Sequence, residues 1–278
     1  MGEGAAAARR GQRQGRRLSL LAVAVEGRGL VDPEAPVFRA DDEALLRGSV
    51  AFETVRTYGG VPFLLDRHIR RFRFSIDALA LPAADGVEAL VELVVDAAPP
   101  DHVLRIYRTE QVLVATVAGL PPGLEEVRAR GVALCSVDVG APAPLLAGAK
   151  TTSYGEAFAA RRMAESRGAD EALLVADGLV LEAATANIWW RRGDELCTPA
   201  TRAGVLPGVT RELVLELEAV TDGEFPLAEL AAADEAFTTS SIREVMPVVL
   251  LDGKPVGNGL PGPAAARLQA ALRLRSTG

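Results

Sequence analysis

The sequence predicts an α+β protein with a smaller N-terminal domain and a larger C-terminal domain. Short strand-like runs, bounded by turn residues, alternate with amphipathic helical segments along the chain. The length of 278 residues fits either one large domain or two of moderate size. A Pro121-Pro-Gly123 break interrupts the pattern as an interdomain linker would.

The N-terminal half is expected to contain two β-hairpins and two helices. The first hairpin covers 49–65, and the second covers 105–117. Between them, Asp66 is expected to cap a helix whose apolar residues recur at helical spacing. A second helix is expected over 86–98. These elements predict a small domain that contains both strands and helices.

The C-terminal half is expected to form a mixed α+β domain rather than a doubly wound parallel sheet. In chain order, the expected elements are strand 131–137, helix 154–167, strand 171–175, hairpin strands near 180 and at 188–191, helix 211–220, strand 235–239 and helix 263–274. Ser153 and Glu156 have the spacing of a capping box, which predicts the start of the first of these helices.

These patterns divide the chain into four segments. Residues 1–17 are rich in Ala, Gly and Arg, and we expect them to form a disordered basic arm. Residues 18–120 form the small α/β domain, 121–125 the interdomain linker and 126–278 the large domain. No stretch reaches the roughly 20 apolar residues that span a bilayer, so no membrane partner is expected.

The composition argues against several other classes of partner. The 37 acidic and 30 basic residues give a net charge of −7, so no overall field favours nucleic acid. Cys135 and Cys197 lack metal-ligand spacing, and a reducing cytoplasm is the simplest setting for them. His68 and His102 are separate and lack neighbouring ligands at metal-site spacing, so no metal site is expected.

Lysine is scarce in this chain, because only Lys150 and Lys254 occur among the 30 basic residues. Arginine cannot replace lysine in Schiff-base chemistry, since its guanidinium stays protonated and is no nucleophile. Lys254 lies in a polar turn and is expected to be solvated. Lys150 follows a loop rich in Ala and Pro and precedes a predicted helix. On this context alone, an ordinary surface lysine remains an alternative for Lys150.

Six motifs occur in a fixed order along the chain. They are Gly148-Ala-Lys-Thr-Thr-Ser-Tyr154, Gly168-Ala-Asp-Glu-Ala172, Leu181-Glu-Ala-Ala-Thr-Ala-Asn-Ile188, Thr198-Pro199, Leu206-Pro-Gly-Val-Thr-Arg211 and Ala233-Asp-Glu-Ala-Phe237. Together they resemble the fold-type IV pyridoxal-phosphate (PLP) enzymes, which include D-amino-acid and branched-chain aminotransferases and aminodeoxychorismate lyases. The resemblance extends from about Leu18 onward. It implies the two-domain fold-type IV aminotransferase architecture, with the cofactor at the domain interface and 126–278 as the cofactor-binding domain.

The resemblance implies roles for three residues around the cofactor ring. Lys150 would hold PLP as a Schiff base and then move the substrate α-proton as a general acid and base. Glu182 would pair with the pyridine nitrogen, which makes the ring a stronger electron sink. Tyr154 would donate a hydrogen bond to the ring oxygen. An exposed strand glutamate and a packed first-turn aromatic are the alternatives for Glu182 and Tyr154.

The resemblance also implies a phosphate site built from several elements. Arg71 resembles the family's phosphate arginine, although Arg70 is an immediate competitor and a surface position is the alternative. Free amides at a helix start and turn hydroxyls would complete the site. The residues concerned are Val209 and Thr210 before a helix, and Ser240 and Ser241 in a turn. Helix capping and local turn hydrogen bonds are the alternatives for these four.

Substrate recognition is where this chain departs from the family pattern. The turn Arg108-Thr-Glu-Gln111 is short where many relatives have a longer Gly/Arg-rich loop. By location, Arg105, Tyr107 and Arg108 are candidates for binding the substrate carboxylate, with ordinary strand and turn roles as alternatives. Thr54 sits where a lyase hydroxyl could assist.

The function implied by the resemblance is transamination between an amino acid and a 2-oxo acid, with D-amino acids favoured by family analogy. One alternative is 4-amino-4-deoxychorismate lyase, which expels pyruvate. A branched-chain L-amino-acid aminotransferase and a non-catalytic cofactor-binding relative are the others. The domain junction and the resemblance also favour a homodimer.

Overall fold

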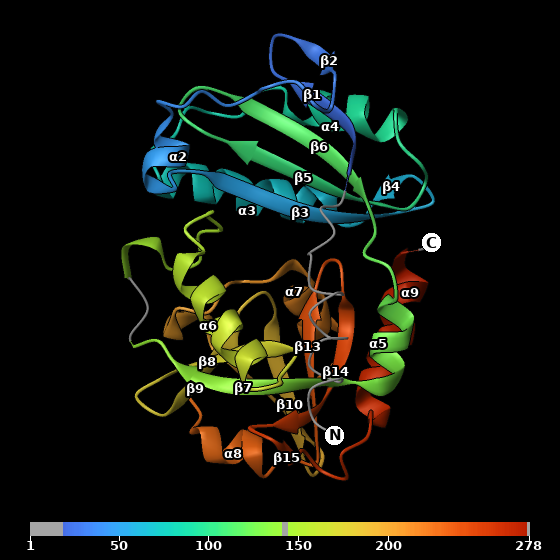
Figure 1. Ribbon diagram of the computed structural model, residues 1–278. Helices are drawn as coiled ribbons and strands as arrows, with labels where there is room; N and C mark the ends of the chain where they lie inside the picture. Colours follow the sequence, from blue (N-terminus) through green and yellow to red (C-terminus); the bar gives the residue numbers. More distant parts are fainter. Residues whose placement is uncertain (1–18, 141–143, 277–278) are drawn as a thin grey trace, which may run out of the picture.

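The computed structural model describes residues 19–140 and 144–276, which fold as two β-sheets with helices packed on them (Figure 1). The expected α+β class is confirmed. We call the part built on β1–β6 the upper half and the part built on β7–β15 the lower half, after their places in Figure 1. The predicted basic arm, 1–17, lies outside the described residues.

The sheet of the upper half is antiparallel, with the strand order β2-β1-β6-β5-β3-β4. Its strands are β1 (Leu20–Val25), β2 (Gly29–Val31), β3 (Ala51–Tyr58), β4 (Val61–Pro62), β5 (His102–Arg108) and β6 (Leu113–Gly119). Both predicted hairpins are confirmed, because β3 pairs with β4 and β5 pairs with β6. Gly59 and Gly60 both have positive φ, +55° and +88°, which suits a tight hairpin turn. The β1–β2 hairpin was not predicted.

Among the described residues, three helices belong to the upper half: α2 (Glu43–Arg47), α3 (Leu65–Ala78) and α4 (Val87–Asp96). The predicted Asp66 cap is wrong, because α3 begins at Leu65 and is preceded by Leu64 in the left-handed conformation. Asp66 instead lies in the first turn, where a carboxylate favours the helix dipole. Ile69 and Phe72 of α3 are buried in the core of the upper half.

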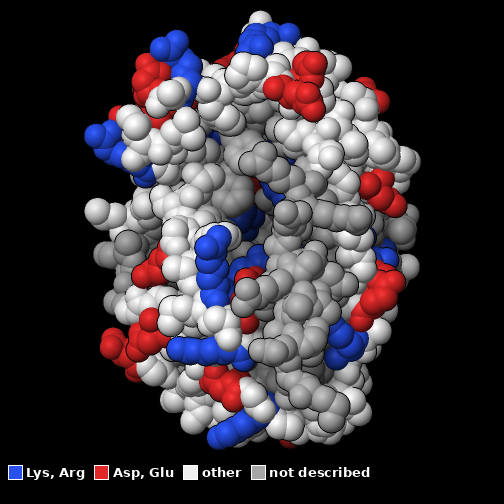
Figure 2. Space-filling view, in the orientation of Figure 1, with Lys and Arg blue, Asp and Glu red and all other residues white. Residues whose placement is uncertain are grey.

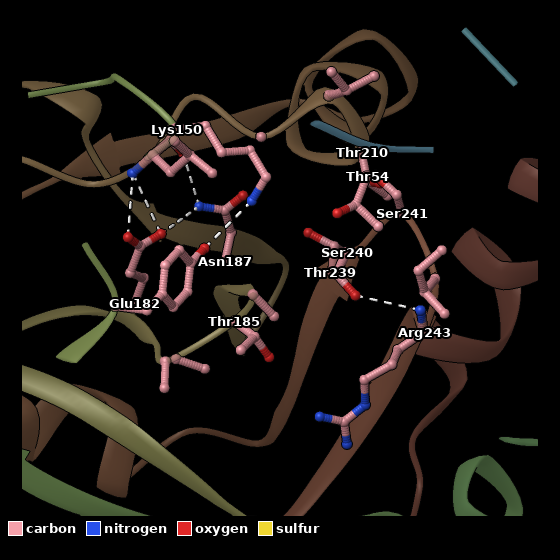
Figure 3. A pocket seen from close by; sticks show the side chains of 18 of the residues that line it. Thr54, Lys150, Glu182, Thr185, Asn187, Thr210, Thr239, Ser240, Ser241 and Arg243 are labelled. Carbon is pink, nitrogen blue, oxygen red and sulfur yellow. Dashed lines mark hydrogen bonds between the residues drawn. The ribbon is translucent and has the colours of Figure 1, made fainter. Parts of the chain in front are cut away.

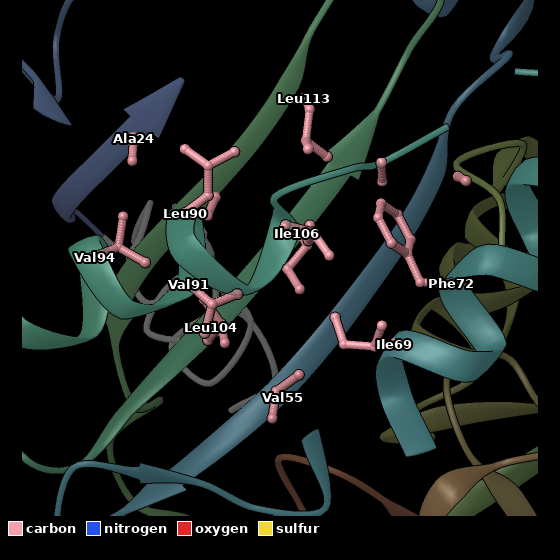
Figure 4. Packing of buried hydrophobic residues seen from close by; sticks show 14 of the residues in the cluster. Ala24, Val55, Ile69, Phe72, Leu90, Val91, Val94, Leu104, Ile106 and Leu113 are labelled. Carbon is pink, nitrogen blue, oxygen red and sulfur yellow. The ribbon is translucent and has the colours of Figure 1, made fainter. Parts of the chain in front are cut away.

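The two faces of the upper sheet differ in chemistry. Val55, Leu104 and Ile106 are completely buried against α3 and α4, as Figure 4 shows. Because side chains alternate along a strand, their neighbours Thr54 and Arg105 point to the opposite face. That face looks toward the lower half, and both residues line a cavity there.

The sheet of the lower half is mixed, with the order β12-β11-β10-β13-β14-β7-β8-β9 and β15 paired to β14. Its strands are β7 (Val132–Asp138), β8 (Glu171–Ala176), β9 (Leu179–Ala183), β10 (Asn187–Arg192), β11 (Glu195–Pro199), β12 (Val220–Gly223), β13 (Glu235–Ser240), β14 (Glu244–Leu251) and β15 (Lys254–Pro255). The predicted hairpin of strands near 180 and at 188–191 is wrong, since β9 pairs with β8 while β10 pairs with β11 and β13. A single bridge between Ala183 and Ala186 closes the turn from β9 to β10.

Helices of the lower half cover both faces of its sheet. They are α5 (Leu124–Arg130), α6 (Gly155–Ser166), α7 (Val209–Leu217), α8 (Leu227–Ala231) and α9 (Pro263–Ser276), with 3-10 turns η1 (Pro144–Leu146) and η2 (Thr201–Ala203). The predicted capping box is wrong, because Tyr154 precedes α6 without a side-chain cap and Ser153 donates to the Gly48 carbonyl. Helix α7 begins at Val209, two residues before the predicted start.

The lower sheet separates two cores. Trp190 packs with Phe225 on one face, whereas Trp189 packs with Phe237 on the other. The second core also receives Phe63 from the upper half, next to the β3–β4 hairpin. The two halves are therefore joined by shared apolar packing.

A buried carboxylate, Glu244, also joins the halves. It is 1% exposed, and its own φ of +56° lies in the left-handed region. Its hydrogen-bond and ion-pair partners come from three elements: Arg56 and Tyr58 of β3, Arg128 of α5, and Gln269 and Arg273 of α9. One negative charge thus organises three arginines where the halves meet.

Replacing Glu244 by glutamine should lower the free energy of unfolding by about 3 kcal/mol or more, because buried guanidinium groups lose their counter-charge. Denaturant unfolding would measure this loss. Glu88→Gln is the matched control, since its pair with Arg73 is exposed on both sides (49% and 60%) and should contribute less than about 1 kcal/mol. Equal losses in the two variants would contradict the role assigned to Glu244.

Candidate active site

A cavity of about 440 Å³ lies between the two halves. Figure 2 shows this face of the molecule hollowed there, with Lys and Arg side chains gathered in and below the hollow. The basic lining residues are Arg71, Arg105, Lys150, Arg161 and Arg243. Glu182 is the one carboxylate among the described lining residues. The cavity is therefore suited to anionic ligands, although the whole chain is acidic.

Lys150 is fixed through its own backbone to the upper half. Its amide donates to Ser75 Oγ at 2.9 Å, and its carbonyl accepts from the Phe52 amide at 3.0 Å. The side chain enters the cavity, where Nζ lies 4.3 Å from the centre of the Phe52 ring and 3.3 Å from Tyr154 Oη (Figure 3). Because the main chain is held on both sides, the amine has a defined position.

The pocket lowers the pKa of Lys150 to about 8. Loss of contact with water is the largest cause, and the positive charge of Arg71 adds to it, while Glu53 and Glu182 act in the opposite direction. An exposed lysine has a pKa near ~10.4, so far more of this amine is neutral at neutral pH. The neutral amine is the nucleophilic form.

Glu182, at the end of β9, lies across the cavity from the Lys150 amine. Its carboxylate accepts from the Leu206 amide at 3.3 Å and from Asn187 Nδ2 at 3.1 Å. Burial raises the pKa of Glu182 to about 7, against the lowering effects of the Leu206 amide and of Lys150. Gly208 makes this arrangement possible, because a Cβ there would collide with Asn187 Oδ1.

Tyr154 completes the set around the Lys150 amine. Its ring meets Phe52 edge to face, with 5.7 Å between the ring centres. Burial first, and Glu182 second, raise the pKa of Tyr154 to about 12, so the phenol keeps its proton at neutral pH. The hydroxyl is therefore a hydrogen-bond donor at the edge of the cavity.

Arg71 is held rigidly at the upper wall. Its Nε and Nη2 donate to the buried Glu53 carboxylate at 2.7 and 2.8 Å, and its Nη1 donates to the Pro207 carbonyl at 2.9 Å. His68 contacts the same carboxylate at 2.7 Å. A guanidinium has five N–H donors, so Arg71 has donors left for a ligand. The competitor Arg70 is exposed and pairs with Glu212.

The cavity also brings together the other residues predicted for phosphate binding. Val209 and Thr210 form the first turn of α7, where backbone amides have no partner within the helix. Ser240 is the last residue of β13, Ser241 follows it in the turn to β14, and both line the same cavity. Helix amides, hydroxyl groups and Arg71 thus surround one space, which is the donor set that a phosphate requires.

Of the predicted substrate residues, only Thr54 and Arg105 line the cavity. Tyr107 stacks behind Phe52, with ring centres 6.3 Å apart. Arg108 lies on the opposite face of β5, where it donates to the Pro82 carbonyl and pairs with Glu26. Strand alternation places Arg108 with Leu104, on the side away from the cavity.

Several lining residues were missed by sequence reasoning. Asn187 stands inside the quoted Leu181–Ile188 motif, five residues after Glu182, and this spacing was a usable signal. Arg243 follows the two predicted serines closely. Arg161 carried no signal, because nothing in the sequence separates it from the other arginines of its helix.

The described residues contain neither a cluster of metal-binding side chains nor a membrane-spanning helix. In the ranges 19–140 and 144–276, no group of three or more His, Cys, Asp or Glu side chains could hold a metal ion. None of the described helices has the length and apolar character needed to cross a membrane.

A lysine with a lowered pKa, a facing carboxylate and a cluster of anion-binding donors suit the class of enzyme that holds a phosphorylated carbonyl cofactor on lysine. Comparison with known sequences identifies the family. The profile of the Amino-transferase class IV family matches residues 50–251, more than half of the chain. The chain belongs to this family, whose cofactor is pyridoxal 5′-phosphate.

Curated relatives in this family differ in reaction and substrate. A D-alanine aminotransferase of Bacillus licheniformis is 30% identical over 84% of this chain and 89% of its own length. A Methanocaldococcus jannaschii protein provisionally named a branched-chain-amino-acid aminotransferase is 29% identical over 86% of this chain and 90% of its own length. Aminodeoxychorismate lyase of Bacillus subtilis is 27% identical over 88% of this chain and 91% of its own length.

Solved structures agree with the fold. A hypothetical aminotransferase from Mycobacterium tuberculosis, in a form with α-ketoglutarate and PMP bound, superposes with a TM-score of 0.82. It is 25% identical, and the match covers 91% of this chain and 98% of that one. The two-sheet architecture is therefore the fold-type IV aminotransferase architecture.

The lowered pKa of Lys150 can be tested on cofactor-free protein. Reductive methylation with formaldehyde should reach half of its maximal rate at Lys150 near pH 8, because the amine loses its proton as the pH rises through that value. Mass spectrometry of the Lys150 peptide would follow the reaction, with an added lysine peptide of ordinary pKa, ~10.4, as internal reference. A midpoint equal to that of the reference would contradict the lowered pKa.

Proposed function

We propose that the protein is a PLP-dependent aminotransferase that moves an amino group between an amino acid and a 2-oxo acid, with Lys150 as the catalytic residue. The observation that carries the proposal is the Lys150 amine, whose pKa is lowered to about 8, in one cavity with Glu182. Such an amine can attack a carbonyl carbon near neutral pH.

The donor set of the cavity fits PLP group by group. The Lys150 amine suits the aldehyde, the Glu182 carboxylate suits the pyridine nitrogen and the Tyr154 hydroxyl suits the ring oxygen. The phosphate would be held by Arg71, Val209, Thr210, Ser240 and Ser241. When bound, PLP supplies an electron sink for the electrons released at the substrate Cα.

The chain's own residues provide the proton chemistry. Lys150 Nζ, once free of the cofactor, is a neutral amine that accepts the substrate α-proton and returns it. Nζ donates a hydrogen bond to Tyr154 Oη at 3.3 Å, which keeps the amine oriented. Asn187 and the Leu206 amide hold the Glu182 carboxylate in place. A cation beside Glu182 would favour its charged form.

Arg105 is our candidate for binding the substrate carboxylate. It projects from β5 into the cavity and has no carboxylate partner among the described residues. The other lining arginines all have one: Arg71 pairs with Glu53, Arg161 with Glu165 and Arg243 with Glu171. An unpaired guanidinium facing a cavity is available for a ligand carboxylate.

The amino donor that we favour is a D-amino acid, supported by the D-alanine aminotransferase relative. Branched-chain transamination is an alternative that the Methanocaldococcus relative supports. The lyase alternative is supported by the Bacillus subtilis relative and by Thr54, whose side chain lines the cavity.

We also propose that the enzyme is a cytoplasmic homodimer. Exposed apolar residues occur on α2 (Leu45 and Leu46) and on α6 (Phe158), two helices that lie on the left side of the molecule in Figure 1, and a second copy could cover them. Cys135 and Cys197 are free and buried, as suits a reducing compartment.

Visible absorption of the PLP-loaded protein would test the reaction and its handedness. The band of the lysine-bound cofactor should disappear on adding D-alanine, persist with L-leucine, and return on adding a 2-oxo acid. Loss of the band with L-leucine alone would reverse the preference. A band that no amino acid converts would favour the lyase, and no band even with added cofactor would favour the non-catalytic relative.

Lys150→Ala should reduce transamination at least about a thousandfold, because both the nucleophile and the proton carrier are removed. Lys254→Ala is the matched control, since Lys254 is exposed and lies outside the cavity. Full activity in the Lys150 variant would refute the mechanism.

Glu182→Gln should slow turnover by about 10- to 100-fold and weaken cofactor retention, because a charge-assisted contact is lost. Steady-state rates and dialysis of the loaded enzyme would measure the two effects. Unchanged values of both would remove the proposed role of Glu182.

A further inference from the structure

We infer that Glu53, held by His68, is a positioning residue that aims the Arg71 guanidinium at the cofactor's phosphate, so that the site selects the phosphorylated form of the cofactor. The inference rests on the proposed PLP-dependent function and adds how the phosphate is discriminated. Neither Glu53 nor His68 lines the cavity, so both act through Arg71.

Glu53 lies on the core side of β3, where a charged group is unexpected. Its neighbours Phe52 and Thr54 line the cavity, and strand alternation turns Glu53 to the opposite face. Val55, on that same face, belongs to the apolar core that also contains Phe72 (Figure 4). The Glu53 side chain is 0% exposed. A carboxylate in such a core is costly unless all of it is paired.

The Glu53 carboxylate is fully paired and charged. Oε1 accepts from Arg71 Nε, and Oε2 accepts from Arg71 Nη2 and from the Thr54 amide. Burial alone would raise the pKa of Glu53, but the charge and hydrogen bonds of Arg71 outweigh it and lower the pKa to about 2. Burial lowers the pKa of His68, so its neutral ring donates from Nδ1 to Oε2 at 2.7 Å. The pair is therefore ionic at neutral pH.

This pair fixes the direction of the Arg71 guanidinium. Nε and Nη2 face Glu53 at 2.7 and 2.8 Å, and Nη1 donates to the Pro207 carbonyl at 2.9 Å. These bonds to described residues leave one N–H on Nη1 and one on Nη2 for a ligand. Because two parallel bonds to one carboxylate prevent rotation of the guanidinium, the remaining N–H groups have a set direction.

The elements that carry this pair also hold the reactive lysine. Ser75 Oγ donates to the Arg71 carbonyl and accepts from the Lys150 amide, both at 2.9 Å. The amide of Phe52, next to Glu53 in β3, donates to the Lys150 carbonyl. The spacing between the amine and the guanidinium is therefore set by one packed unit. A ligand with an aldehyde and a phosphate can use both ends of it, whereas an aldehyde without phosphate uses only one.

The test compares PLP with pyridoxal, which lacks the phosphate, on cofactor-free protein. Absorbance of the lysine-bound band gives a dissociation constant for each. In Glu53→Gln, the ratio of the pyridoxal constant to the PLP constant should fall on the order of tenfold, because an amide group replaces one of the oxygens that orient Arg71. Equal weakening of both ligands would overturn the inference, since it would indicate general structural damage.

A double-mutant cycle tests whether Glu53 acts through Arg71. Arg71→Met should lower the same ratio by itself. Adding Glu53→Gln to Arg71→Met should then cause no further fall, because the guanidinium that Glu53 positions is already gone. Two independent, multiplying losses would contradict the positioning role.

Glu88→Gln is the matched control, because Glu88 pairs with another arginine of α3, Arg73, on the exposed surface. Both dissociation constants should be unchanged in this control. A fall of the ratio equal to that in Glu53→Gln would show that the effect is not specific to the buried pair.

Inorganic phosphate separates this inference from the proposed function. Calorimetric titration of cofactor-free protein should show phosphate binding that is on the order of tenfold weaker in Glu53→Gln than in the parent. A parent protein that forms no band with PLP would refute the proposed function, and the phosphate comparison would still apply. Equal phosphate affinity in parent and variant would overturn the role of Glu53.

Discussion

The buried Glu244 carboxylate is the contact on which the geometry of the cavity depends. It draws together Arg56 from the upper half and Arg128 and Arg273 from the lower half. The cavity has no complete wall within either half, because Arg71 and Arg105 come from above and Glu182 from below. Charge pairing in a dry interface is costly to disrupt, so it fixes the distance across the cavity.

Desolvation in this cavity moves a base and an acid toward each other in pKa. The pKa of Lys150 is lowered to about 8 and the pKa of Glu182 is raised to about 7. Burial is the largest cause of both shifts. Opposite shifts of this kind are expected wherever a cationic and an anionic group share one poorly hydrated space. The two groups can therefore change protonation near neutral pH, as proton-transfer chemistry requires.

Local sequence signals predicted the local parts of the structure. Gly59 and Gly60 marked the β3–β4 turn, and helical spacing located α3 to within two residues of its start. Short strands such as β2 and β12 were missed, because their existence depends on partners far along the chain. The same reason hid the Glu244 cluster, whose members become neighbours only in the folded sheets.

The site was predicted to the extent that its residues carry distinctive chemistry. Lys150 stood out because lysine is rare here, and Glu182 stood out within a motif. Arg108 was a reasonable candidate by position, yet strand alternation turned it to the other face of β5. Arg161 and Arg243 could not be singled out among so many arginines without knowing which of them face the cavity.

The backbone attachment of Lys150 has a thermodynamic consequence. The lysine is hydrogen-bonded to β3 of the upper sheet, whereas Glu182 ends a strand of the lower sheet. Any ligand that engages both residues spans two separately packed cores, so its binding free energy is coupled to the free energy of holding those cores together. Occupancy of the site should therefore also stabilise the packing between the upper and lower halves.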